Sequence, residues 1–208
     1  MTNLKESSIF PIEDRSFVSK EKCLSELKDL PSNLFALFPT VKKHFNAEIR
    51  NTPPEARGRD LEATLFNSKM VQSIQSYFPN DCRYVKYGRF ILQKYGYTFL
   101  FKKLNKYGMP MNIKTKNVAN INQQSRKNLF SSIEYPRELI LYFGYQKNYI
   151  GDIVKPQIVY VNENKVNWII TENDITNMFV STITLGEDPL DIVTPKIRYN
   201  IKKEVVNK

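Results

Sequence analysis

The sequence is poor in the residues from which common enzyme sites are built. It has one histidine, His44, two widely separated cysteines, Cys23 and Cys82, and seven scattered glycines. A single histidine excludes the HExxH and Cys2His2 zinc motifs, and the two cysteines cannot form a CxxC pair. The glycines form neither a GxGxxG nor a GxxxxGK[ST] phosphate loop. The sequence therefore excludes the common zinc-enzyme, Rossmann and ATPase classes.

Long hydrophobic runs are also missing. No segment approaches the roughly 20 apolar residues that a membrane-spanning helix needs. The first 15 residues contain acids and lack an apolar core, so they do not read as a signal peptide. Two cysteines without a motif are typical of buried thiols in a reducing compartment. We therefore expect a cytoplasmic protein with no membrane partner.

The hydrophobic content is sufficient for an ordinary core. Hydrophobic residues make up 41% of the 208 residues and aromatic residues 12%. A chain of this length is typically one domain that needs no disulfide or metal to hold it. The order of patterns predicts a single α+β domain over 1–208, mainly helical over 1–80 and mainly β over 81–206 with one or two helices. The helical part is expected to pack on a mostly antiparallel β-sheet.

Three helices are expected before residue 80. Ser19 is a candidate N-cap for a helix that ends before Pro31, and a second helix is expected from Thr40. Thr52 and Glu55 have the spacing of a capping box, with a proline in the first turn. This pattern predicts that a third helix begins here and runs to Phe78.

After Pro79 the hydrophobic period changes from about 3.6 to 2, which indicates strands. Residues 83–92 and 97–103 predict an antiparallel hairpin closed by 93–96. A short strand is expected at 111–115, a weak helix at 117–130 and a short helix from Thr171 to about residue 180. Further strands are expected at 139–145, 157–161 and 166–170.

The net positive charge of the chain arises in one quarter of its length. The formal net charge is +10, from 31 basic and 21 acidic residues. Between Asp81 and Glu134 there is no acid, whereas the same stretch contains eleven basic residues. Outside it, basic and acidic residues nearly balance. The whole excess charge therefore belongs to the predicted hairpin and the segment that follows it.

Aromatic residues alternate with the basic ones in this stretch, which favours nucleic-acid binding. Lysine and arginine neutralise phosphates, and exposed aromatic rings stack on unpaired bases. A basic two-stranded ribbon also fits the major groove of DNA. The residues predicted to contact DNA or RNA are Arg83, Lys86, Tyr87, Arg89, Lys94, Tyr95, Lys102, Lys103, Lys106, Lys114, Lys116, Arg126 and Lys127.

A purely structural interpretation accounts for part of the same pattern. Strand alternation sends about half of the aromatic side chains into the core, and lysines on edge strands prevent aggregation. Phe90, Leu92, Phe99 and Phe101 are accordingly expected in the core. The polar residues at 120–125 are equally well explained as base-reading side chains or as a solvated helix face.

A metal-dependent nuclease or toxin-like enzyme is the first alternative. Such an enzyme needs two or three carboxylates around Mg²⁺ and a lysine near the attacking water. The weak candidates are Asp60, Glu62, Asp152, Glu163 and Lys165. Glu163 and Lys165 lie at an expected hairpin tip, which is a poor place for rigid metal ligands. We therefore favour a protein without catalysis or cofactor, and would expect Mg²⁺ only in a nuclease.

A protein-interaction module is the second alternative. In this case the basic face would meet an acidic protein partner, as in an inhibitor or an antitoxin. The composition, size and basic hairpin resemble those of small proteins of phage, plasmid or defence loci. The leading hypothesis from the sequence remains nucleic-acid binding through the basic aromatic hairpin.

Overall fold

The structure, a computed structural model, describes residues 18–58, 60–85, 88–112, 115–122, 124 and 139–177. Within these ranges helices precede a six-stranded sheet, which confirms the predicted α+β class. None of the helices described is long and apolar enough to cross a membrane.

The first two helices are separated by a tight corner. Helix α1 is Lys20–Leu27, and the Ser19 hydroxyl accepts a hydrogen bond from the backbone N–H of Lys22 at 3.2 Å, which confirms the predicted N-cap. Helix α2 is Leu30–Ile49 and includes the segment that was expected to interrupt it. Pro31 lies in its first turn, where no N–H is needed. Pro39 lies inside the helix on its exposed side, so the predicted break before Thr40 is wrong.

Helix α3 is Leu61–Tyr77, and it begins later than predicted. The expected capping box forms only a single 3-10 turn, Pro54–Ala56, without a side-chain cap. Arg57 then adopts an extended backbone, and its guanidinium donates to the carbonyl oxygens of Thr52 and Ile49 at 3.0 and 3.3 Å. These bonds fold the segment back on the end of α2, which stops a helix from starting at residue 53.

The predicted hairpin is a three-stranded unit. Strands β1 (Cys82–Val85) and β2 (Arg89–Lys94) divide the expected strand 83–92 and pair antiparallel. Gly88, with φ +65°, lies at this division. Strand β3 is Tyr97–Lys103, and the turn before it has positive φ at both Tyr95 and Gly96. That geometry is typical of the two-residue turns that close β-hairpins.

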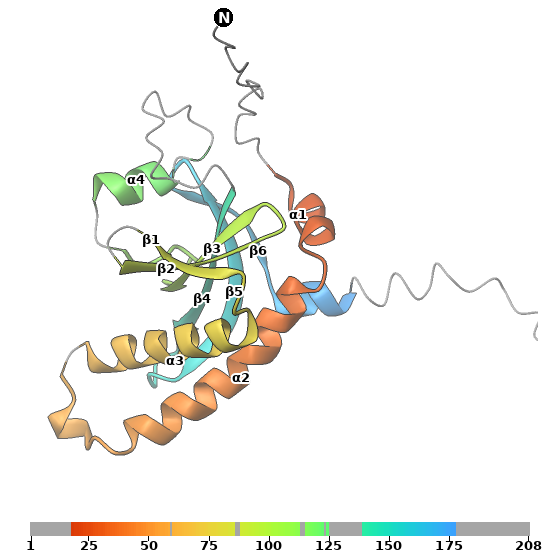
Figure 1. Ribbon diagram of the computed structural model, residues 1–208. Helices are drawn as coiled ribbons and strands as arrows, with labels where there is room; N and C mark the ends of the chain where they lie inside the picture. Colours follow the sequence, from red (N-terminus) through yellow and green to blue (C-terminus); the bar gives the residue numbers. More distant parts are fainter. Residues whose placement is uncertain are drawn as a thin grey trace, which may run out of the picture.

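Strands β4 (Leu139–Lys147), β5 (Ile153–Asn162) and β6 (Lys165–Ile170) complete the sheet. The spatial order is β1-β2-β3-β4-β5-β6, and only the β3–β4 pair is parallel. Helix α4 (Lys116–Asn122) belongs to the connection between these two strands and lies across the sheet from α2 and α3 (Figure 1).

Other predicted elements are confirmed only in part. Residues 111, 112 and 115 are not in a strand, because the chain turns there after an isolated bridge between Leu104 and Pro110. Residues 172–177 form the predicted short helix, and Asp174 accepts hydrogen bonds from the backbone and hydroxyl of Thr171. The rest of the predicted helix 117–130 from residue 125 onward, and residues 178–208, lie outside the described residues.

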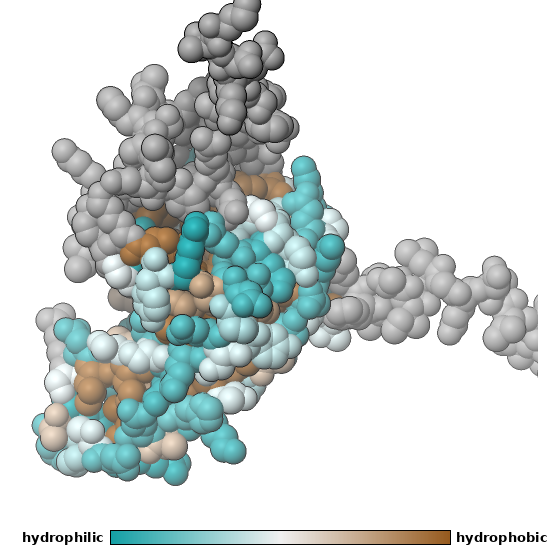
Figure 2. All heavy atoms as spheres, in the orientation of Figure 1, coloured by the Kyte–Doolittle hydropathy of each residue, from teal (hydrophilic) through white to brown (hydrophobic). Residues whose placement is uncertain are grey.

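The main core lies between the sheet and helices α1 to α3. Phe35 of α2 contacts Phe143 edge-on at 5.7 Å between ring centroids, and Phe66 of α3 packs 4.4 Å from the Tyr145 ring. The four residues expected in the core are all buried there, namely Phe90, Leu92, Phe99 and Phe101. In the view of Figure 2, much of the surface over α2 and α3 is hydrophilic, with a hydrophobic area at the lower left.

A second core covers the opposite face of the sheet and contains buried polar contacts. The side-chain amide of Gln124 donates to the carbonyl oxygens of Ile140 and Val161 at 2.8 and 2.9 Å, and its oxygen accepts from the Ile140 N–H at 2.8 Å. The Tyr142 hydroxyl donates to Asn122 at 2.9 Å. These two amide side chains are therefore neither base-reading nor solvated; they bind the ends of strands.

Candidate nucleic-acid interface

The described basic residues of the acid-free stretch between Asp81 and Glu134 differ in their neighbours and in their burial. Lys86, Tyr87, Lys114, Arg126 and Lys127 lie outside the described residues, and Lys116 is described only through the backbone of α4. The described basic residues are Arg83, Arg89, Lys94, Lys102, Lys103 and Lys106.

At its closed end the hairpin is held against the N-terminal helices. Lys94 forms an ion pair with Asp81 at 2.9 Å and lies 5.2 Å from the centroid of the Phe78 ring. The Tyr95 hydroxyl donates to Asp29 at 3.1 Å, at the start of α2. Their surroundings give both Lys94 and Tyr95 a structural role, although each was predicted to contact nucleic acid.

At its other end the hairpin opens. Strand β2 pairs with β3 only from Lys94↔Tyr97 to Leu92↔Phe99, whereas β1 stays paired with β2 through Arg89 and β4 stays paired with β3 through Lys103. Within the described strands, the first residues of β2 therefore pair only with β1, and the last residues of β3 pair only with β4. A cleft of about 650 Å³ lies at this opening.

The cleft collects side chains from both sheet faces and from α3. Phe90 and Phe101 belong to the helix-covered core, and Leu100 belongs to the second core. Because side chains alternate along a strand, Arg89 and Lys102 lie on the same face as Leu100. The remaining lining residues are Tyr84 and Gly88, together with Asn67, Ser68, Val71, Gln72 and Gln75 of α3.

Arg89 and Lys102 place two positive charges in this cleft. Loss of water contact lowers the pKa of Lys102, and the positive charge of Arg89 lowers it further. Lys102 as a whole residue is nevertheless exposed. Among the described residues, no carboxylate forms an ion pair with either side chain. The site therefore holds two neighbouring cations that an anion would stabilise.

The cleft also has an aromatic and an amide wall. Tyr84 is 59% exposed, and its ring rests edge-on against Phe90 at 5.4 Å between centroids. Helix α3 lines the same cleft with side chains that have both donor and acceptor groups, all of them exposed: Asn67, Ser68, Gln72 and Gln75. Hydrophilic side chains stand above α3 in Figure 2, on the side where β1 and β2 lie.

The other basic residues lie around this cleft or beyond it. Arg83 is exposed on β1 and pairs in register with Ile91, so it shares the sheet face of Arg89. Lys103 is half-buried at the end of β3. Lys106 lies over the exposed ring of Tyr107, 4.9 Å from its centroid, in the turn after β3. Among the basic side chains that the structure describes in this stretch, only Arg89 and Lys102 are brought together.

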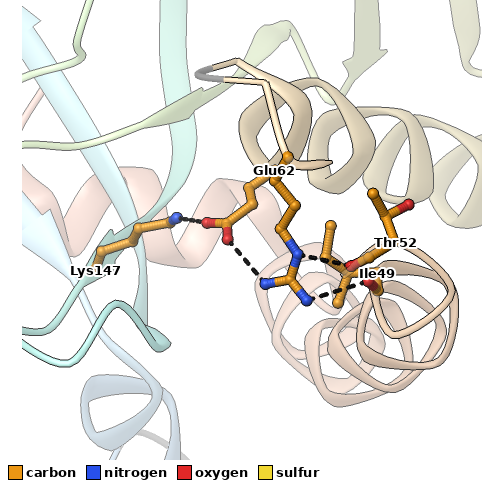
Figure 3. Close-up of polar contacts among 5 residues, drawn as sticks. Ile49, Thr52, Glu62 and Lys147 are labelled. Carbon is orange, nitrogen blue, oxygen red and sulfur yellow. Dashed lines mark hydrogen bonds and ion pairs between the residues drawn. The ribbon is translucent and has the colours of Figure 1, made fainter. Parts of the chain in front are cut away.

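Glu62 lies at the centre of a network of hydrogen bonds and ion pairs (Figure 3). One carboxylate oxygen accepts from Lys147 of β4, and the other lies 3.5 Å from the guanidinium of Arg57. The hydrogen bond from Lys147, with the positive charges of Lys147 and Arg57, holds the pKa of Glu62 below its ordinary value despite partial desolvation. Glu62 thus joins the end of α2, the start of α3 and β4.

The other candidate carboxylates are far apart or exposed. Asp60 precedes α3 and is exposed. Asp152 precedes β5 and Glu163 follows it, so the ten residues of that strand separate them by about 30 Å. Lys165 begins β6 beside Glu163. Within the described ranges, no three metal-ligating side chains gather at one place.

Sequence reasoning missed the contribution of α3. Asn67, Ser68, Gln72 and Gln75 were not predicted as site residues, although Ser68, Gln72 and Gln75 recur at helical spacing and so share one face. This polar stripe was the available signal. It does not reveal that the stripe faces the open end of a hairpin. Comparison with protein-family models, curated proteins and solved structures finds no match to this chain.

Proposed function

We propose that this protein binds nucleic acid through Arg89, Lys102 and the surrounding cleft, and that it does so without catalysing a reaction. One observation carries the proposal: two cations converge in a partly desolvated cleft and neither pairs with a carboxylate among the described residues. Mutual repulsion and desolvation both act against this arrangement. A phosphate between the two side chains would offset both costs by pairing with the two positive charges.

The neighbouring groups favour nucleic acid over other anions. An exposed tyrosine ring at the same cleft can stack on a base, and amide side chains can pair with base edges. Arg83 adds a further exposed cation on the same sheet face. A carboxylate-rich protein partner would use the cations and leave the ring and the amides without a function.

The carboxylates give no support to a nuclease. Both oxygens of Glu62 are engaged by cations, and Asp152 and Glu163 lie at opposite ends of β5. Metal-dependent cleavage needs carboxylates that converge on one ion. The proposal therefore assigns binding alone to the described residues.

A cytoplasmic location belongs to the same proposal. Cys23 and Cys82 are both free, and burial raises the pKa of their thiols to about 12 and about 11. Such thiols react slowly and are stable in a reducing compartment.

The test is fluorescence anisotropy with labelled duplex DNA, single-stranded DNA and RNA at several salt concentrations. We expect binding that weakens steeply with salt. Replacing Arg89 and Lys102 with alanine should reduce the slope of log K against log salt by about 1.4 for a single strand or about 1.8 for duplex DNA, if each contacts one phosphate. The charge-reversed pair R89E/K102E should weaken binding more than tenfold.

A matched control is available on α2. Lys43 and Arg50 are exposed basic residues far in the sequence from the basic stretch, and K43E/R50E changes the net charge by the same amount. This variant should bind within about threefold of the wild type. Equal losses in the two double variants would mean that net charge alone drives binding, and the absence of binding at low salt would refute the proposal in favour of an acidic protein partner.

A further inference from the structure

The cleft has the size and chemistry of a site for an unpaired nucleotide. Its volume of about 650 Å³ lies within the range of pockets that enclose small organic ligands. Its lining includes two cations, one exposed aromatic ring and a row of amide and hydroxyl side chains. This is the combination that single-strand binding uses: cations along the backbone and rings against base faces.

A duplex would leave most of these groups unused. In double-stranded nucleic acid the base faces are stacked on each other and the pairing edges are occupied, so only backbone and groove edges are accessible. Arg89 and Lys102 could contact a duplex phosphate at the mouth of the cleft. Tyr84 could stack only on a base that has left its own stack.

The position of the hairpin opening explains how a strand would enter. Pairing between β2 and β3 ends at Leu92↔Phe99, and the cleft extends from there to α3. Tyr84 of β1 and Ser68 and Gln72 of α3 all line this cleft. A chain of nucleotides that enters this opening would therefore meet the ring, the α3 side chains and the two cations within one cleft.

We infer that the cleft between α3 and the open end of β2–β3 binds one or two unpaired nucleotides of a single strand. The phosphate contacts Arg89 and Lys102, the base stacks on Tyr84, and the α3 amides contact the base edges. This inference rests on the proposed function and names its substrate class. It specifies where the strand lies, which the proposed function leaves open.

The sharpest experiment fills the cleft without altering charge. Ser68 and Ser76 are exposed serines of α3, and each donates its hydroxyl to the carbonyl four residues earlier, at 2.9 Å. Only Ser68 lines the cleft. S68W should weaken binding of a labelled ten-nucleotide single strand at least tenfold, whereas S76W should stay within twofold of the wild type. Circular dichroism and thermal melts of both variants verify that they fold.

A second pair of variants tests the stacking contact. Y84A should weaken single-strand binding at least fivefold, because a base loses its stacking partner. Tyr149, which is 97% exposed in the turn between β4 and β5, provides the control Y149A, with no change expected. The ten-base-pair duplex of the same sequence should bind at least tenfold more weakly than the single strand.

The results separate this inference from the proposed function. Wild-type affinity in S68W and Y84A, with binding still weakened more than tenfold in R89E/K102E, would overturn the cleft site and leave nucleic-acid binding in place. Equal affinity for duplex and single strand would also overturn it. If no nucleic acid binds the wild-type protein, both proposals fall.

Discussion

Replacing Gly144 of β4 with alanine should destabilise the protein by about 2–3 kcal/mol, because the neighbouring strand leaves no room for a methyl group. A Cβ at this position would lie 2.3 Å from the carbonyl oxygen of Lys102 and 2.6 Å from Cγ of Leu104. The nearer atom is backbone of β3, which is paired with β4 from Tyr97↔Leu139 to Lys103↔Tyr145. It cannot move away without disturbing that pairing.

The magnitude follows from two opposing terms. Inserting a methyl group into packed structure costs about 1–3 kcal/mol and sometimes more, and here the clash is with backbone. Alanine regains about 0.5–1 kcal/mol because glycine loses more conformational freedom on folding. Because the clash is with backbone, the packing cost lies at or above its usual upper limit, and the net loss of stability is about 2–3 kcal/mol. For a chain of this size this corresponds to a fall in Tm of roughly 4–12 °C.

The assay is urea denaturation followed by circular dichroism, together with thermal melts. Gly58 provides the control, because a Cβ there would meet no atom within 4 Å and its φ is not in the left-handed region. G58A should stay within about 0.5 kcal/mol of the wild type. A G144A protein as stable as G58A would refute the close approach of β3 to β4 at Lys102, and with it the described position of that lysine.

Three further predictions concern single side chains. The pKa of Glu62 is lowered in the folded state, so its ion pairs stabilise the protein at pH values above the ordinary pKa, and this contribution is lost as the pH falls through the folded pKa. E62Q should therefore be about 1 kcal/mol less stable than the wild type at pH 7, and the urea midpoints of the two proteins should converge in acid. A difference that stays constant with pH would contradict the pairing. Q124L should cost about 2–4 kcal/mol in the same assay, because it leaves the Ile140 N–H and two carbonyl oxygens without partners, and a stability near that of the wild type would show that Gln124 does not bridge β4 and β5. K102M should have a Tm no lower than that of the wild type, because it removes a cation that is partly desolvated and repelled by Arg89. The variant should nevertheless bind single strands less tightly. A lower Tm would mean that Lys102 stabilises the fold.

Local signals predicted the elements whose cause is local. The Ser19 cap, a turn within 93–96 and the helix after Thr171 each depend on bonds or backbone angles within a few residues; the cap and the turn are confirmed, and the helix is confirmed as far as residue 177. The strands β4 to β6 were also recognisable, because their β-branched and aromatic runs are long. The expected capping box failed because a competing contact prevailed: the Arg57 side chain binds the backbone carbonyls of Thr52 and Ile49 at the end of α2.

The assembly of the sheet depended on contacts that a strand pattern does not contain. Nothing in residues 97–103 or 139–145 indicates that β3 and β4 pair in parallel, because the crossover between them has little periodicity of its own. Gln124 shows the same limit. Its neighbours in sequence are polar, and only the packing of the second core makes it a buried partner for two strands.

By itself, the sequence determined the α+β class, the location of the excess positive charge and the hydrophobic faces of the strands, because composition and alternation are properties of the chain. The tertiary structure alone decided which cations could act together. It tied Lys94 to Asp81, brought Arg89 near Lys102 and placed Tyr84 and polar side chains of α3 in the same cleft. The reason is physical: a charge acts through its distance to other groups and its access to water, and both are set only when strands distant in sequence have packed.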